Sequence, residues 1–62
     1  MTLSEYATRY LSTVDSEDIV MLSDVAGQIY ALGRNYGVAH PDSAIPEIMS
    51  EPLARLFPLP TT

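Results

Sequence analysis

The sequence contains no cysteine, so it can form neither a disulfide bond nor a thiolate metal site. Its single histidine, His40, is not enough to anchor a metal alone, and we expect no metal and no cofactor. A chain of 62 residues buries only about 60% of the surface that its unfolded form exposes, so its core is marginal. Because no covalent or metal cross-link is present, we expect oligomerisation or a bound partner to supply further stability.

Lysine is also absent, and the only basic residues are Arg9, Arg34 and Arg55, which leaves a net charge of −5. Nucleic-acid-binding proteins need a positive surface for phosphate contacts, so we do not expect DNA or RNA as a partner. Charge instead predicts a basic partner, or simply an acidic helix start that keeps the protein in solution. The acidic residues that lie close together are Asp15, Glu17, Asp18 and Asp24.

Long apolar runs are missing as well. No stretch approaches the 18 uninterrupted apolar residues that indicate a transmembrane helix, so we expect no membrane association. The N-terminal residues Met-Thr-Leu-Ser-Glu lack the basic and apolar regions of a signal peptide. Together with the absence of cysteine, these features predict a cytoplasmic protein.

The most informative segment is 17–36, which predicts one long helix with a wide apolar side. At about 100° per residue its apolar residues cover an arc of roughly 180°, whereas a surface helix usually needs little more than 100°. The helix should therefore have neighbours on two sides, either within a tight core or in a second molecule. Its apolar arc consists of Ile19, Leu22, Val25, Ala26, Ile29, Tyr30, Leu32, Gly33 and Tyr36.

Local signals define the ends of this helix. Asp15 or Ser16 is expected to cap its start, with Glu17 and Asp18 in the first turn, where the helix dipole favours acids. Gly37 fits the left-handed position that follows many helix ends. On the apolar side, Gly33 would allow another backbone to approach closely.

Shorter helices are predicted on both sides of segment 17–36. Thr2 and Glu5 form a capping box for a helix over 3–14. Ser43 and Ser50 are candidate caps for helices over 43–49 and 50–57, which Pro52 either divides or kinks into one. We therefore predict a single all-α domain over 1–62, a small bundle of three to four helices, with 58–62 as a frayed tail.

Catalytic signals are weak. His40 and Asp42 lie two residues apart in a predicted turn and are candidates for acid–base chemistry, but an exposed turn explains them equally well. No recognisable motif places a nucleophile, and no glycine-rich loop is present to hold a phosphate. We therefore expect that the protein is not an enzyme.

Residues 32–38, Leu-Gly-Arg-Asn-Tyr-Gly-Val, resemble the stretch that ends the first helix and forms the turn in many helix-turn-helix DNA-binding motifs. That resemblance implies a small transcriptional regulator, which is our alternative function. It covers only seven residues, and the segment that should read the bases, 39–49, has two prolines and no arginine or lysine.

The aromatic residues favour a different function. All four tyrosines and the one phenylalanine lie on predicted apolar faces, and tyrosine is enriched at protein interfaces. They serve equally well in a small core, and the sequence leaves both roles open. We expect a non-enzymatic protein–protein interaction module: a small accessory subunit, an antitoxin-like protein or an inhibitor of a larger protein, acting as a homodimer. The candidate interface residues are Tyr6, Tyr10, Tyr30, Arg34, Tyr36 and Phe57.

Overall fold

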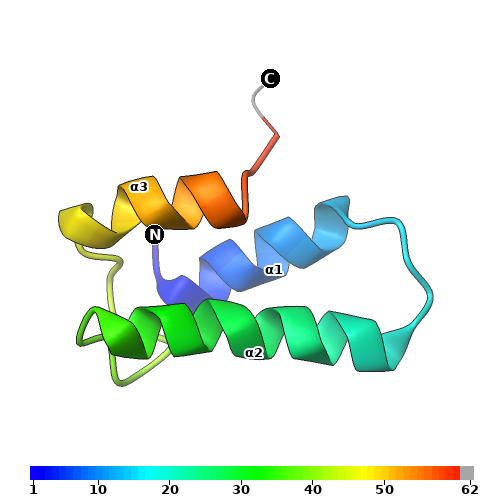
Figure 1. Cartoon of the computed structure of the whole chain (residues 1–62), viewed down its shortest axis with the longest axis horizontal. Coiled ribbons are helices and arrows are strands. Elements are labelled where there is room, and N and C mark those ends of the chain that lie inside the picture. Colours follow the sequence, from blue (N-terminus) through cyan, green and yellow to red (C-terminus); the bar gives the residue numbers. More distant parts are fainter. Residues whose placement is uncertain (61–62) are drawn as a thin grey trace.

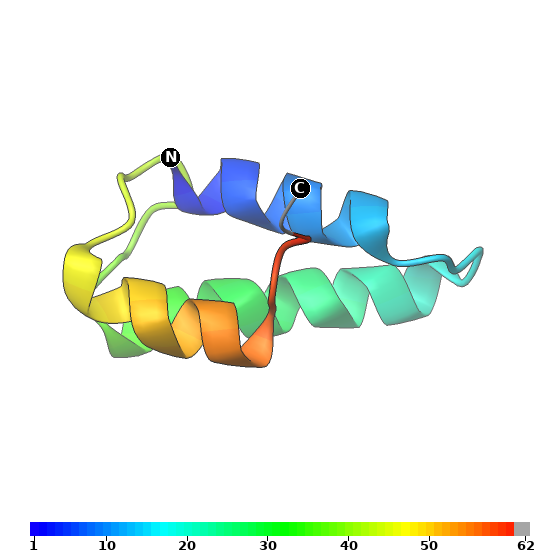
Figure 2. The same cartoon turned by 90° about the horizontal axis from the view of Figure 1, so that it is seen from above.

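The computed structural model describes residues 1–60 and contains three helices, α1 (Leu3–Thr13), α2 (Ile19–Asn35) and α3 (Glu47–Leu56). Helices α1 and α3 run opposite to α2 (Figure 1). Viewed from above, α2 and α3 form one layer and α1 lies behind it (Figure 2). The predicted all-α bundle is confirmed. Within the described residues, no helix has the length and apolar character needed to cross a membrane.

The start of α1 is held both locally and by a distant segment. The predicted capping box is present: the Thr2 hydroxyl accepts from the Glu5 N–H at 3.1 Å, and the Glu5 carboxylate accepts from the Thr2 N–H at 3.3 Å. The next two amides donate to distant carbonyls, Leu3 to Ser43 at 3.3 Å and Ser4 to Pro41 at 2.8 Å. Amides that are usually left unpaired at a helix start are therefore satisfied here.

Helix α2 begins later than predicted. Asp18 is its cap, not Asp15 or Ser16, because the Asp18 carboxylate accepts from the N–H groups of Val20 at 3.0 Å and Met21 at 3.2 Å. The Ser16 hydroxyl accepts from the Asp18 N–H at 3.1 Å, outside the helix. The expectation that Glu17 and Asp18 lie in the first turn was therefore wrong.

The end of α2 agrees with the sequence. Gly37 has a φ of 85°, as predicted for the left-handed position. Its N–H donates to the Arg34 carbonyl at 3.1 Å, and the Val38 N–H donates to the Gly33 carbonyl at 2.8 Å. This pair of hydrogen bonds is a Schellman motif, and it turns the chain back towards α1.

The prediction for 43–57 was partly wrong. A single helix, α3, contains Pro52, and Pro46 rather than Ser43 or Ser50 occupies the cap position. Residues 43–46 are not helical because they pair with the start of the chain: Ala44 forms an isolated antiparallel bridge with Thr2, and the Ile45 N–H donates to the Met1 carbonyl at 3.1 Å. A distant contact thus overrides the local helical pattern.

The core lies where the three helices meet. Gly33 gives the close approach predicted for it, although to a side chain and not to a backbone: a Cβ atom there would collide with the Leu3 side chain. Leu59, in the segment predicted to fray, is half-buried against the core, while residues 61–62 of that segment lie outside the described residues. The buried apolar residues are Leu3, Tyr6, Ala7, Ile29, Val38, Met49, Leu53 and Phe57.

Candidate functional site

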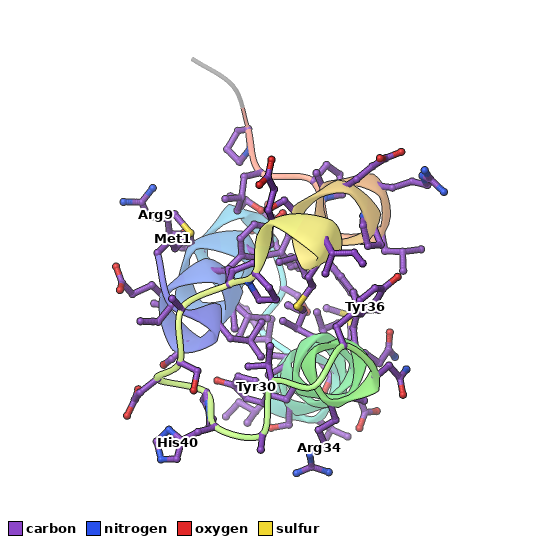
Figure 3. The ribbon with its side chains drawn as sticks, turned by 90° about the vertical axis from the view of Figure 1, so that its left-hand side faces the viewer. Met1, Arg9, Tyr30, Arg34, Tyr36 and His40 are labelled. Carbon is purple, nitrogen blue, oxygen red and sulfur yellow. The ribbon has the colours of Figure 1, made fainter. Side chains whose placement is uncertain are left out.

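The six candidate interface residues fall into two groups. Tyr6 and Phe57 are core residues with 8% of their surface exposed, and Tyr10 is half-buried with its ring edge-on to Phe57 at a centroid distance of 5.4 Å. The other three, on α2 or at its end, are accessible: Tyr30 is half-buried, while Arg34 and Tyr36 are exposed (Figure 3). In this structure the first group stabilises the fold, and the second remains open to a partner.

Tyr6 joins α1 to the end of α3. Its hydroxyl donates to the Phe57 carbonyl at 2.5 Å and approaches the Leu53 carbonyl at 3.4 Å. Burial, and secondarily the Tyr10 phenol, raise the pKa of Tyr6 above its ordinary value. The residue therefore acts as a neutral hydrogen-bond donor inside the bundle.

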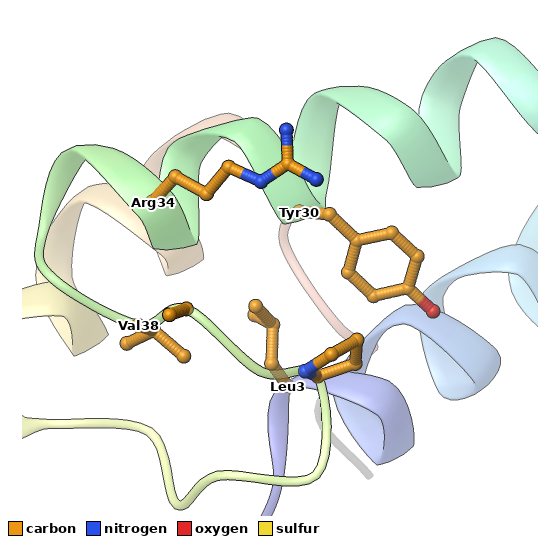
Figure 4. Close-up of a pocket in the computed structure, with 6 residues that line it drawn as sticks. Leu3, Tyr30, Arg34 and Val38 are labelled. Carbon is orange, nitrogen blue, oxygen red and sulfur yellow. The ribbon is translucent and has the colours of Figure 1, made fainter.

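Around Tyr30 and Arg34 there is only a small cavity, of about 70 Å³, which is also bordered by Leu3 and Val38 (Figure 4). Pockets for small molecules usually measure about 300–1,000 Å³, so this cavity does not hold a typical ligand. The two side chains are instead available as surface contacts at the C-terminal end of α2.

A larger hollow lies between α2 and the end of α3. This α2–α3 groove has a volume of about 360 Å³. Leu56, which lines it, is 58% exposed. Ile48, in the first turn of α3, is 72% exposed, and Tyr36 is 37% exposed where α2 ends. We call Tyr36, Ile48, Leu56 and the groove together the α2–α3 face. The groove is lined by Gln28, Ala31, Leu32, Asn35, Leu56 and Phe57, none of which is ionisable.

A second apolar surface lies at the other end of α2. Ile19 is 76% exposed and Val20 is 71% exposed, although Ile19 belongs to the predicted apolar arc. Both follow the acidic cap Asp18 directly, and no basic residue occurs between positions 10 and 33. This end of the molecule therefore combines exposed apolar side chains with negative charge.

His40 and Asp42, the candidate pair for acid–base chemistry, lie on the surface. The Nδ1 atom of His40 accepts from the Asp42 N–H at 3.1 Å and lies 3.9 Å from the Asp42 carboxylate, and both side chains are at least 70% exposed. Residues 1–60 contain no group of three or more side chains suited to hold a metal ion. The pair thus forms a local turn contact in solvent.

Sequence reasoning missed Ile48, Leu56 and Val20 as surface residues. Ile48 and Leu56 have helical spacing with the buried residues of α3. At about 100° per residue Ile48 falls at one edge of an arc roughly 180° wide, and Leu56 falls on the same side, between Ile48 and the buried Met49. The width of that arc was the available signal, and it is the same signal that marked α2.

No family model, curated protein or solved structure matches this chain.

Proposed function

We propose that this protein is a non-enzymatic protein–protein interaction module that binds a larger protein, as a small accessory subunit, an antitoxin-like protein or an inhibitor. The observation that carries the proposal is the exposure of large apolar side chains on two separate surfaces, the α2–α3 face and the start of α2. Contiguous exposed apolar surface on a small protein commonly marks an interaction site. We further propose that it acts in the cytoplasm, which its lack of cysteine supports, and as a homodimer.

Charge indicates the kind of larger partner. The start of α2 carries exposed Ile19 and Val20 beside Asp18, with no basic residue nearby in the sequence. A partner that docks there would present apolar anchors surrounded by lysine or arginine, because complementary potentials guide association.

The test is affinity enrichment from an extract of the source cells, with the wild-type protein and Val20→Glu as baits. A protein enriched by the wild type is then purified, and its binding is measured by titration calorimetry. We expect Val20→Glu to weaken binding at least about tenfold, because it adds charge to an apolar contact. Ala54→Glu, an equal charge change at an exposed position of α3 away from this surface, is the matched control.

The proposal fails if no enriched protein binds the purified chain directly. It also fails for this surface if Val20→Glu and Ala54→Glu bind equally well. The alternative of a helix-turn-helix regulator gains no support from the geometry, because residues 36–46 separate α2 from α3, far more than the short turn of that motif.

A further inference from the structure

The α2–α3 face is apolar, and its groove is lined by uncharged side chains. Its exposed side chains are Tyr36, Ile48 and Leu56, and the groove between the helices adds only apolar and amide groups. The basic residue of α3, Arg55, is already paired with Glu51 at 2.8 Å. The groove lining thus offers no charge with which to select a basic or an acidic partner, and the Glu51–Arg55 pair on α3 carries no net charge.

From these observations we propose that the α2–α3 face binds the same face of a second copy of this chain, in a two-fold symmetric dimer. The inference rests on the proposed protein-binding function and assigns one of its surfaces. Each copy carries a net charge of −5, so two copies repel unless they meet where the charge is low. The α2–α3 face, with its uncharged groove, meets that condition, whereas the acidic start of α2 does not.

The face is also self-complementary. A two-fold axis brings identical patches together, so each patch must supply both projections and hollows. Here the exposed Leu56 projects at the edge of a groove of about 360 Å³. Under two-fold symmetry, Leu56 of each copy is placed against the groove of the other, and Gln28 and Asn35 at its lining supply hydrogen-bonding amides.

The α2–α3 face lies on a broad side of the molecule. The molecule extends 31 × 27 × 17 Å, and the α2–α3 layer forms one of its two broad sides (Figures 1 and 2). A second copy can therefore cover both the groove and the apolar side chains beside it.

The first experiment measures the dimer by sedimentation velocity over a hundredfold range of concentration. We expect the wild type to form a dimer and Leu56→Glu to raise its dissociation constant at least about tenfold, because each dimer would then bury two like charges. The matched control is Ala54→Glu, which adds the same charge at an exposed position of α3 that does not line the groove. Circular dichroism establishes that both variants remain folded.

The second experiment locates the contact. Because the chain has no cysteine, Ala31→Cys places a single thiol in the groove, and we expect oxidation to link two copies rapidly. Ser23→Cys, exposed elsewhere on α2, should link more slowly by at least about tenfold, since symmetry does not bring it near its equivalent.

Three outcomes overturn the inference. A wild type that stays monomeric throughout excludes the dimer, while calorimetry with the larger partner still tests the proposed function separately. A dimer that Leu56→Glu and Ala54→Glu affect equally excludes this face. If the wild type is monomeric and Leu56→Glu abolishes its binding to a larger protein, the face belongs to that partner instead.

Discussion

The two halves of α2 have similar apolar residues but very different surroundings. In the C-terminal half, Ile29 and Gly33 are buried between α1 and α3. In the N-terminal half, Ile19 and Val20 are more than 70% exposed, because α3 ends at Leu56, beside the middle of α2 (Figure 1). The comparison shows that an apolar pattern predicts which residues share a side of a helix, whereas the lengths of the neighbouring helices decide which of them are covered.

The largest effect should come from shortening an isoleucine in each half. Ile29→Ala should lower the free energy of unfolding by about 2–5 kcal/mol, because it leaves a cavity in the core. Ile19→Ala should change it by less than about 0.5 kcal/mol, because its side chain is already in solvent. Urea unfolding followed by circular dichroism measures both.

If Ile29→Ala does not fold, Ile29→Val replaces it, with an expected loss of about 0.5–1.5 kcal/mol. Equal losses at the two positions would contradict the difference between the halves.

A substitution at Tyr6 tests the hydrogen bond that joins α1 to the end of α3. Tyr6→Phe should cost about 1–2 kcal/mol, because the buried Phe57 carbonyl loses its donor. Since burial raises the pKa of Tyr6 above 10.0, the unfolded chain ionises first as the pH rises. The contribution of Tyr6 is therefore complete below about pH 10 and declines as the pH rises further towards the folded pKa.

Thermal unfolding of the wild type and Tyr6→Phe between pH 8 and 11 checks this sign. The difference in Tm between the two proteins should narrow above about pH 10. A constant difference across this range would show that the hydroxyl is not buried.

Alanine substitutions at the two glycines within α2 should change the free energy of unfolding by smaller amounts, in opposite directions. Gly27 has open space around it, so Gly27→Ala should stabilise the protein by about 0.5–1 kcal/mol through helix propensity. Gly33→Ala should instead destabilise it by about 1 kcal/mol, because the new methyl group collides with the buried Leu3 side chain and the strain outweighs the same propensity gain. Denaturant midpoints of the two variants, each compared with the wild type, should shift in opposite directions.

A loss of similarly small size is expected from the helix cap at the exposed start of α2. Asp18→Ala should cost about 0.5–1 kcal/mol, because the N–H groups of Val20 and Met21 lose their acceptor. Asp18→Asn, which keeps an acceptor oxygen, should cost much less and serves as the control. A loss equal to that of Ile29→Ala would mean that this end is as important to the fold as the covered one.

Local features were predictable from the sequence, and features that depend on distant contacts were not. The capping box of Thr2 and the left-handed Gly37 involve residues a few positions apart, so the sequence identified both. The start of α3 depends on the bridge between Ala44 and Thr2, which no local pattern contains. Local propensity therefore favoured a helix over 43–46 that the distant pairing prevents.

The candidate surface was predictable to a similar extent. The width of the apolar arc of 17–36 indicated neighbours on two sides, either in a tight core or in a second molecule, and the structure leaves Ile19 of that arc exposed, together with Ile48 and Leu56 of α3. It also places Tyr6 and Phe57 in the core. The apolar arc of a helix cannot distinguish a core residue from an exposed one, because the positions of the neighbouring helices decide which part of the arc is covered.

The hydrogen bonds that join the start of α1 to residues 41–43 have a consequence for local opening. The amides of Leu3 and Ser4 donate to carbonyls that belong to another part of the chain, whereas those of Val20 and Met21 depend on a neighbouring carboxylate. The first pair becomes accessible to deuterium only when the bundle as a whole opens, while the second pair needs only the end of one helix to fray. The amide hydrogens at the starts of α1 and α2 should thus exchange on very different timescales. The slower exchange is expected at the start of α1, although it lies near the N-terminus.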